Sequence, residues 1–323
     1  MLGVVTVNTG TPDAPRAREV RAFLSRFLAD PRVVELPRLL WLPLLYGLIL
    51  PLRSPRSARN YRRVWMDGGS PLAVYSQRLR QALELELEAQ HGGDVAVQSA
   101  FLYSDPSLAT ALEKLRAAGA QRIVVLPMYP QASGATTGAV YDQTGAALRG
   151  WRALPGLHLI GDYHADAGYV AALANSVREH WQQNGRTARL LISFHGIPQR
   201  CVDRGDAYAD QCRATAGQLA AALELGADEW SLGFQSRFGK ARWLTPATDR
   251  LLAELPASGV RTLTVICPGF AVDCLETLEE IAIRGREIFL HAGGAQLQYV
   301  PALNDRGDHA RALARLVLAN AGA

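Results

Sequence analysis

Lysine is almost absent from this chain of 323 residues, since Lys114 and Lys240 are its two occurrences among 34 basic residues. The other basic residues are arginines that are spread along both halves, and the formal net charge is +4. Proteins that bind nucleic acid usually gather basic residues into a patch, a stripe or a tail. The charge pattern therefore indicates no nucleic-acid partner.

Cysteine is scarce as well, with four residues at positions 201, 212, 267 and 274. No two of them are separated by only two residues. A zinc ribbon needs such close pairs, and a disulfide framework is typical of short chains that are rich in cysteine. We therefore expect reduced, mostly buried thiols in a reducing compartment.

No apolar run reaches the length of a membrane-spanning helix. The segment 36–52 raises the question, but its 17 residues include prolines and Arg38, whereas a spanning helix needs roughly 20 apolar residues. The first residues have the pattern of a strand and lack the charged region of a signal peptide. We expect a cytoplasmic protein in which residues 36–52 form an exposed apolar lip.

Strands and helices alternate, and one unit of this pattern occurs twice. Residues 94–127 predict a strand, a helix with Asp105 as its N-cap and Pro106 in its first turn, and a second strand. The same order recurs 140 positions later, with Thr245 and Pro246 before the helix. The pairs in register are Pro106/Pro246, Leu112/Leu252, Leu115/Leu255, Gly119/Gly259 and Val125/Val265. The repeat predicts an α/β fold of two similar Rossmann-like halves, each a doubly wound parallel sheet.

The boundary between the halves is predicted where Pro155-Gly156 interrupts the pattern, just before a new apolar strand at 157–160. We expect an N-terminal half over residues 1–153 and a C-terminal half over residues 154–323. The pattern leaves open which half the last helix, after Asp308, covers. Open α/β sheets bind ligands at the carboxyl ends of their strands, so we expect both halves to face one ligand cleft.

His195 directly follows an apolar strand, which places its imidazole at the carboxyl edge of the second sheet. A histidine in this position can act as a base or as a metal ligand. On position alone, a structural hydrogen-bonding role is the commoner one. His195 is therefore a candidate that needs support from other residues.

Three glutamates follow the last strand of the repeat, namely Glu276, Glu279 and Glu280, and their helical spacing predicts an acidic face. Asp273 and Glu276 also have the spacing of a capping box, in which Asp273 caps the helix and Glu276 reaches back to a backbone donor. Acidic residues are common in the first turn of any helix. From spacing alone, capping is the stronger interpretation of Glu276.

Two loops place polar and aromatic side chains at strand ends. Gln235, Ser236 and Trp243 lie between a strand and a helix, and this mixture suits a flat conjugated ligand. Tyr129 and Ser133 belong to a loop of small residues without the lysine or the spaced glycines of nucleotide-binding loops. No nucleotide is expected, and the competing interpretation is a pair of ordinary surface loops.

Arginines recur near helical spacing after the apolar lip, at positions 53, 56, 59 and 63. They could meet the carboxylates of a ligand or the headgroups of anionic lipids. An ordinary solvated face explains most of them. Arg63, which follows Tyr61-Arg62, is the first candidate for a ligand contact.

Together these segments resemble the ferrochelatase family, of proteobacterial type, in the order that the family has and over almost the whole chain. The motifs that carry the resemblance are Asn8-Thr9-Gly10-Thr11-Pro12, Tyr61-Arg62-Arg63, Gly69-Ser70-Pro71-Leu72, Leu126-Pro127-Met128-Tyr129-Pro130, Ser193-Phe194-His195-Gly196-Ile197-Pro198, Phe234-Gln235-Ser236-Arg237, Trp243-Leu244 and the stretch 267–280. The resemblance implies two Rossmann-like domains around a porphyrin cleft. It also implies a lyase that inserts Fe(II) into protoporphyrin IX, the last step of haem biosynthesis.

The resemblance assigns roles to the candidates, because His195 matches the family's histidine and Glu276 the first carboxylate of its acidic helix. A chelatase must remove two pyrrole protons and bring in a cation that imidazole and carboxylate ligands suit. Which of the two residues takes the protons stays open. The implied metal contacts are His195, Glu276 and Glu280. The implied porphyrin contacts are Arg63, Tyr129, Ser133, Gln235, Ser236 and Trp243.

The chain departs from the family pattern in three places. Leu102 stands where relatives commonly have an arginine that contacts a propionate, so Arg63 is expected to carry more of that contact. Arg284 stands where some relatives continue the acidic ladder, which leaves the route of the ion open. Asp13 stands where members that act on coproporphyrin tend to have tyrosine, which favours protoporphyrin.

No tightly bound cofactor is expected, since iron enters as a substrate. Some relatives bind a 2Fe–2S cluster, but the spacing of the four cysteines gives such a cluster no support. Contact of the apolar lip with the inner face of the membrane would be peripheral, and the oligomeric state is not predicted. The alternatives are a chelatase for coproporphyrin or another tetrapyrrole, and a non-catalytic porphyrin- or haem-binding protein that leaves His195 and Glu276 without a task.

Overall fold

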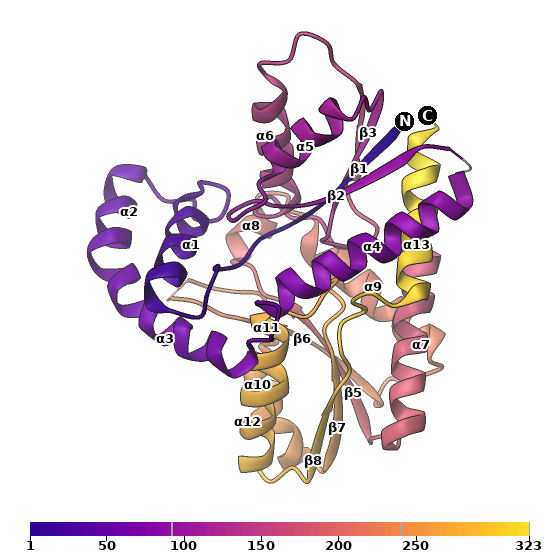
Figure 1. Ribbon diagram of the computed structural model, residues 1–323. Coiled ribbons are helices and arrows are strands. Elements are labelled where there is room, and N and C mark those ends of the chain that lie inside the picture. Colours follow the sequence, from indigo (N-terminus) through magenta and orange to yellow (C-terminus); the bar gives the residue numbers. More distant parts are fainter. Residues whose placement is uncertain (92, 240, 323) are drawn as a thin grey trace. The chain divides into compact units, whose positions relative to one another are not determined.

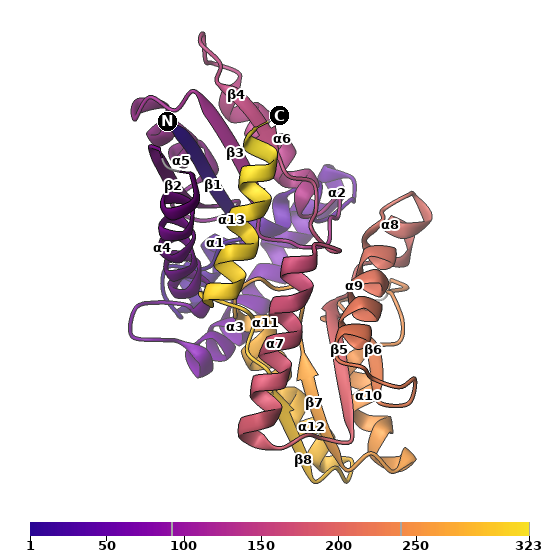
Figure 2. The same cartoon turned by 90° about the vertical axis from the view of Figure 1, so that its right-hand side faces the viewer.

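Two α/β units make up the chain in the computed structural model, which describes residues 1–91, 93–239 and 241–322. The first unit comprises residues 1–129, 133–162 and 305–323, and the second comprises residues 130–132 and 163–304. Each contains one parallel four-stranded sheet, with the orders β2-β1-β3-β4 and β6-β5-β7-β8 (Figure 1 and Figure 2). Since the order is the same in both, the predicted pair of similar parallel sheets is confirmed.

The first sheet is built around its first strand. Its members are β1 (Leu2–Asn8), β2 (Val95–Phe101), β3 (Arg122–Pro127) and β4 (Gly156–Leu159). Every residue of β1 is buried, as expected for a central parallel strand that is covered on both faces. The helices that pack around this sheet are α4 (Pro71–His91), α5 (Leu108–Ala117), α6 (Thr137–Leu148) and α13 (Gly307–Ala321).

The apolar lip belongs to a helical segment that follows β1. This segment consists of α1 (Ala17–Ala29), α2 (Arg38–Leu44), the π-helical η1 (Leu45–Ile49) and α3 (Leu50–Val64). Trp41 is buried and donates its indole N–H to the carbonyl of Leu28 at 2.7 Å, which ties α2 to the end of α1. Leu39 and Leu40 are 91% and 73% exposed, in agreement with the predicted lip. Within the described part of the chain, no helix has the length and apolar character needed to cross a membrane.

The second sheet is built around β5 (Arg189–His195). It is completed by β6 (Trp230–Gln235), β7 (Thr262–Ile266) and β8 (Gln296–Tyr299). A cluster of buried side chains that includes Leu191, Leu252, Val265 and Phe289 joins this sheet to the helices beside it. The helices of this unit are α7 (Ala167–Asn184), α8 (Gln199–Asp203), α9 (Tyr208–Ala222), α10 (Thr248–Glu254), the 3₁₀ turn η2 (Leu255–Ser258), α11 (Leu275–Thr277), the π-helical η3 (Leu278–Gly285) and α12 (Arg286–His291).

The units exchange the helices that follow their last strands. β4 belongs to the first sheet, yet α7 after it packs with α9 in the second unit. In turn, α13 after β8 packs with α4 and β3 in the first unit. The division therefore differs from the expected halves 1–153 and 154–323, because β4 pairs with β3 through Arg122 and Gly156. The first unit extends to Asp162, and the last helix completes it.

The repeated helices begin two residues later than the sequence suggested. Ser107, not Asp105, is the N-cap of α5, and its hydroxyl accepts a hydrogen bond from the N–H of Thr110 at 3.2 Å. The chain before it is still extended, since the carbonyl of Pro106 accepts from the N–H of Phe101 at 2.9 Å. The second copy repeats this arrangement: the carbonyl of Pro246 accepts from Phe234 at 2.9 Å, and Ala247, not Thr245, is the N-cap of α10.

Candidate active site

The carboxyl edge of the second sheet carries six of the predicted site residues. His195 and Gln235 end the neighbouring strands β5 and β6 and stand opposite each other in the register. Ser236 and Trp243 follow β6, and Glu276 and Glu280 lie on the helical segment after β7. Because β6, β5 and β7 are parallel neighbours, these elements all leave the sheet at the same edge.

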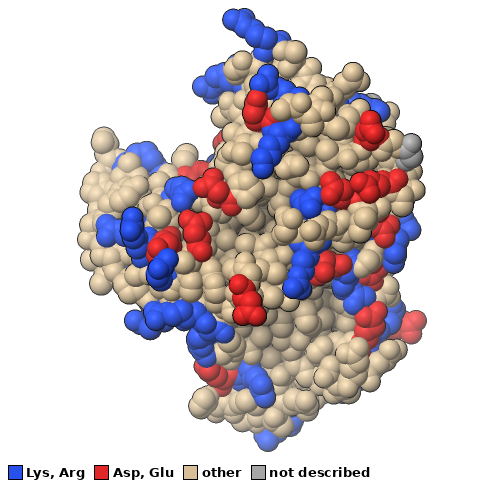
Figure 3. All heavy atoms as spheres, in the orientation of Figure 1, with Lys and Arg blue, Asp and Glu red and all other residues tan. Residues whose placement is uncertain are grey.

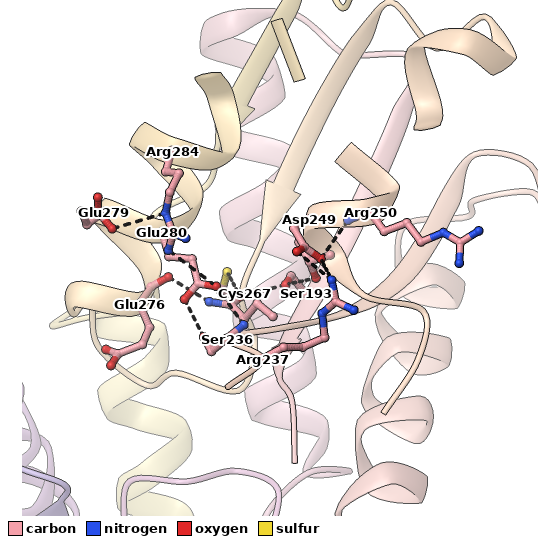
Figure 4. Close-up of polar contacts among 12 residues, drawn as sticks. Ser193, Ser236, Arg237, Asp249, Arg250, Cys267, Glu276, Glu279, Glu280 and Arg284 are labelled. Atoms are coloured by element: carbon pink, nitrogen blue, oxygen red, sulfur yellow. Dashed lines mark hydrogen bonds and ion pairs between the residues drawn. The ribbon is translucent and has the colours of Figure 1, made fainter. Parts of the chain in front are cut away.

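Glu280 is held in place by Ser236. The backbone N–H of Ser236 donates to one carboxylate oxygen at 2.8 Å, and its hydroxyl donates to the other at 2.5 Å (Figure 4). Ser236 has a φ of +66°, a left-handed conformation that side-chain-bearing residues adopt at a cost and that is common at functional sites. Burial raises the pKa of Glu280, while the Ser236 hydrogen bond and the charges of His195 and Arg284 oppose that rise.

Gln235 connects the acidic segment to the sheet. Its side chain is buried, and the amide oxygen accepts a hydrogen bond from the hydroxyl of Ser193 at 2.8 Å. Ser193 lies 2.8 Å from the hydroxyl of Thr248, which continues the chain of contacts toward α10. The amide nitrogen of Gln235 donates to the backbone carbonyl of Glu276 at 2.8 Å. Gln235 therefore fixes the start of the acidic segment against β6.

Asp273 does not cap the helix in the way that the spacing suggested. The N-cap is Cys274, which forms a capping box with Thr277. The buried carboxylate of Asp273 instead accepts hydrogen bonds from Thr277 at 2.8 Å, from Tyr299 at 2.6 Å and from the side chain of Asn304 at 2.8 Å. Glu276 therefore takes no part in a capping box with Asp273, and in Figure 4 its carboxylate points away from Ser236 and Glu280.

The acidic segment is a wide helix, since residues Leu278–Gly285 form the π-helical η3. π-Helical turns are rare and occur frequently at functional sites. Glu280 lies in η3 four positions after Glu276, whose carboxylate points away from it (Figure 4), and Glu279 is buried and turned toward Arg284. Arg284 also lies within ion-pair distance of Glu280, and Figure 4 shows it beside both glutamates.

The tautomer of His195 follows from its hydrogen bond. The Nδ1 atom lies 2.7 Å from the backbone carbonyl of Gly196. A carbonyl only accepts, so Nδ1 is the protonated nitrogen that donates, and in the neutral ring Nε2 carries the lone pair. That lone pair can take a proton or bind a metal ion.

Trp243 packs against Gly196, the residue that follows His195. A Cβ atom at Gly196 would lie 3.4 Å from the Trp243 ring and 2.9 Å from the carbonyl of Gln235, so this approach of backbone to backbone needs a glycine. The indole N–H of Trp243 donates to the carbonyl of Phe238 at 2.8 Å, which fixes the plane of the ring. A flat aromatic surface is thus held rigidly at the edge where His195 ends its strand.

Three predicted residues belong to the first unit. Tyr129 follows β3, and its hydroxyl lies 2.7 Å from the hydroxyl of Thr9, which follows β1. Burial raises the pKa of Tyr129, so the phenol stays protonated. Ser133 is buried before α6, and its carbonyl accepts hydrogen bonds from the backbones of Thr136 and Gly138. Arg63 is exposed in the last turn of α3.

Sequence reasoning missed the residues that hold this site together. Asp273 was assigned only to a helix cap, and its partners Tyr299 and Asn304 were not singled out. Ser193 was noted only within a motif, although it holds the amide of Gln235. Over residues 1–91, 93–239 and 241–322, no three side chains of His, Cys, Asp or Glu lie close enough together to hold a metal ion.

Comparisons with a family model and with curated relatives give the same protein family. The Ferrochelatase family model matches residues 1–321. The chain is 52% identical to the ferrochelatase of Thioalkalivibrio sulfidiphilus over 320 residues, which are 99% of this chain and 87% of that protein. It is also 52% identical to the ferrochelatase of Aeromonas hydrophila, with 98% and 97% of the two chains covered.

Among solved structures, SirB from Bacillus subtilis with Fe³⁺ is similar in fold, with a TM-score of 0.57, 13% identity and coverage of 99% of this chain and 95% of that one. A multi-domain protein from Deinococcus radiodurans described as similar to chelatases has a TM-score of 0.52 and 14% identity, over all of this chain and 54% of that one. These two show the fold, and the family match and the curated relatives show the family. The chain belongs to the ferrochelatase family.

Proposed function

We propose that this enzyme inserts Fe(II) into protoporphyrin IX, with His195 and Glu276 as its central proton- and metal-handling groups. Family membership makes the chain a lyase of haem biosynthesis that inserts iron into a porphyrin. The identity of the porphyrin and the roles of the residues are the proposal. The observation that carries it is the hydrogen bond from Gln235 to the Glu276 backbone, which holds the acidic segment beside the strand pair that ends in His195 and Gln235.

The chemistry needs two proton acceptors and a path for a dication. The hydrogen bond to Gly196 leaves Nε2 of neutral His195 as a base or a metal ligand. The carboxylate of Glu276 is not used in the helix cap, so it can accept a proton or guide the ion. Glu280, one turn further along, is the proposed earlier contact of the ion. An ion in transit needs few protein ligands, because the porphyrin nitrogens supply the final set.

The proposed porphyrin contacts fall into two groups. In the second unit, the fixed ring of Trp243 offers a rigid wall against which a macrocycle can be puckered, and Ser236 lies earlier in the same connection between β6 and α10. The buried Gln235 acts through the backbone of Glu276 rather than by direct contact. In the first unit, we assign porphyrin contacts to Arg63, Tyr129 and Ser133, with Arg63 as the partner of a propionate.

Protoporphyrin rather than coproporphyrin is proposed because position 13 is aspartate. Asp13 is exposed, shortly after β1 and the turn at Gly10. A carboxylate there repels an additional propionate, whereas the tyrosine typical of coproporphyrin-type members does not. This argument concerns one position, and a direct substrate comparison decides it.

No tightly bound cofactor is part of the proposal. Cys267 and Cys274 are buried, and burial raises the pKa of both thiols well above its usual value. Thiolate, rather than thiol, is the ligand of a cluster or a metal. None of the four cysteines forms a disulfide bond, and their spacing in the sequence gives a cluster no support.

The substrate proposal is tested by anaerobic metallation of protoporphyrin and coproporphyrin with Fe(II) or Zn(II), followed by visible absorption. We expect rapid metallation with both ions and a higher kcat/KM for protoporphyrin. A higher kcat/KM for coproporphyrin would reverse the substrate assignment. Tight porphyrin binding without metallation above the uncatalysed rate would contradict the catalytic assignment and favour a non-catalytic porphyrin-binding protein.

Peripheral contact with the membrane surface is also proposed, through the apolar lip. Its exposed side chains include Leu39, Leu40 and Leu52, and α3 continues directly into a stretch with several arginines. In Figure 3 the part of the surface that contains the apolar lip is largely tan at its outer edge and has basic side chains along its lower border. Exposed leucines beside arginines suit insertion into a bilayer surface with anionic headgroups.

We expect the double variant Leu39→Glu/Leu40→Glu to bind anionic vesicles more than tenfold more weakly than the wild type. Burying one leucine contributes roughly 1.5–3 kcal/mol, so losing two of them outweighs a tenfold change in affinity. Sedimentation with vesicles of phosphatidylcholine and phosphatidylserine measures the effect. Leu85→Glu is the matched control, because Leu85 is 67% exposed on α4, outside the lip. Equal vesicle binding by the wild type and the lip variant would contradict the proposal.

A further inference from the structure

Arg284 lies at a small cavity that leads to Glu280. The cavity has a volume of about 80 Å³, and the residues around it include Ser236, Arg237, Asp249, Glu280 and Arg284. The Ser236–Glu280 pair therefore forms part of its wall (Figure 4). Arg284 and Glu280 therefore line the same cavity.

The ionic contacts of Arg284 are long compared with the others at this cavity. Its Nε atom lies 3.7 Å from Glu279 and its Nη2 atom 3.9 Å from Glu280, beyond hydrogen-bond distance. By contrast, Arg237 makes two contacts to Asp249 at 2.8 and 2.9 Å. Glu280 also accepts two short hydrogen bonds from Ser236, in which Arg284 takes no part.

Arg284 is also more exposed to solvent than the two glutamates beside it. The side chain of Arg284 is 47% exposed, whereas those of Glu279 and Glu280 are 4% and 20% exposed. A half-exposed, loosely paired arginine gains little from its ion pairs and can swing into water on a flexible side chain. The carboxylates of Glu279 and Glu280 are mostly buried and cannot move into water in this way. Arg284 is therefore the group of the three that can move away.

We propose that Arg284 is a displaceable counter-ion, which offsets part of the negative charge of Glu279 and Glu280 in the resting enzyme and gives way when a divalent cation reaches Glu280. This proposal rests on the proposed function, because it takes Glu280 as a contact of the ion. The nearby positive charge also weakens retention of the dication at Glu280, since like charges within a few ångströms repel each other. Arg284 would thus favour passage of the ion over trapping.

Replacing Arg284 by glutamine should lower the KM for Zn(II) and Fe(II) by about tenfold at saturating protoporphyrin, because the competing charge is gone. Arg284→Glu should lower the KM further and also lower kcat, since the ion is then held back. Arg284→Lys should stay close to the wild type. Initial metallation rates over a range of metal concentrations give these constants.

Arg286→Gln is the matched control, since Arg286 is an exposed arginine directly after η3 that does not line the cavity. An equal fall in KM in Arg286→Gln would show a general surface-charge effect and overturn the counter-ion. An unchanged or raised KM in Arg284→Gln would overturn it as well.

Glu280→Gln separates this proposal from the proposed function. If that variant raises the KM for the metal while Arg284→Gln leaves it unchanged, the counter-ion alone is wrong. If Glu280→Gln leaves the KM for the metal unchanged, Glu280 does not contact the ion. The counter-ion proposal for Arg284 is then wrong as well. The counter-ion is supported if Arg284→Gln lowers the KM and this fall disappears in the Glu280→Gln background.

Discussion

His195→Ala is expected to lower the rate of porphyrin metallation by about 10²–10⁴-fold, the range for loss of a positioned general base. The imidazole is oriented by its hydrogen bond to the backbone carbonyl of Gly196, so alanine removes the group and leaves this backbone acceptor in place. Glu276→Gln should have a loss of similar size, since the amide keeps the shape but neither accepts a proton nor attracts a dication. Stopped-flow absorption under anaerobic conditions measures both.

Porphyrin affinity is the second readout for these variants. Quenching of tryptophan fluorescence by protoporphyrin should give nearly the same dissociation constant for both variants and the wild type, because neither residue is assigned to hold the macrocycle. Glu88→Gln, at an exposed position of α4, is the matched charge-removing control and should keep full activity. If turnover and porphyrin affinity fell by equal factors, the chemical roles would be replaced by a binding role.

The second large effect concerns stability. Asp273→Ala should lower the free energy of unfolding by about 3 kcal/mol or more, because four donors lose their acceptor and each unsatisfied buried group costs roughly 1–3 kcal/mol. These donors are the hydroxyls of Thr277 and Tyr299, the side-chain amide of Asn304 and the backbone N–H of Ala302. Urea unfolding followed by tryptophan fluorescence measures the change. A midpoint within error of the wild type would refute the assigned role of Asp273.

Tyr299→Phe is the graded comparison, since it removes one of the four donors and leaves the carboxylate in place. We expect a loss of about 1 kcal/mol, the usual contribution of a single buried hydrogen bond. The size of the Asp273→Ala effect relative to this one shows whether the carboxylate acts as a hub. Asp273→Ala should also reduce kcat in the protein that remains folded, because the carboxylate lies just before the segment that carries Glu276.

The strands were predictable because their information is local. The two strands predicted within residues 94–127 are β2 and β3, and their copies 140 positions later are β6 and β7. A run of buried β-branched and aromatic residues between turn residues defines a parallel strand by itself. The repeat in register also predicted two similar parallel sheets, and the structure confirms both.

The helix starts were less predictable, because they depend on hydrogen bonds to distant chain segments. Asp105 is a good capping residue, but the pairing of Pro106 with Phe101 keeps the chain extended past it. Asp273 has the right spacing to Glu276 for a capping box, yet its partners Tyr299 and Asn304 lie 26 and 31 positions away. A local pattern cannot show that a remote side chain takes the acceptor.

The chemical groups of the site could be predicted from the sequence, but the contacts that hold them in place could not. His195 and the glutamates follow strand ends, and parallel strands that are neighbours in the sheet bring such residues to one edge. The support from Ser193 to Gln235 and on to the backbone of Glu276 has no sequence signature, since each contact joins residues more than 40 positions apart. The π-helical turn of η3 likewise depends on packing rather than on a recognisable motif.

The exchange of helices between the units has a consequence for how the chain folds as it is made. Residues 163–304 of the second unit leave the ribosome before α13, whereas the first unit lacks the helix that packs on α4 and β3 until residues 307–321 have been synthesised. Domains generally fold as units during synthesis, the N-terminal one first. Here the order is inverted, and the unit that begins the chain is the last to be completed.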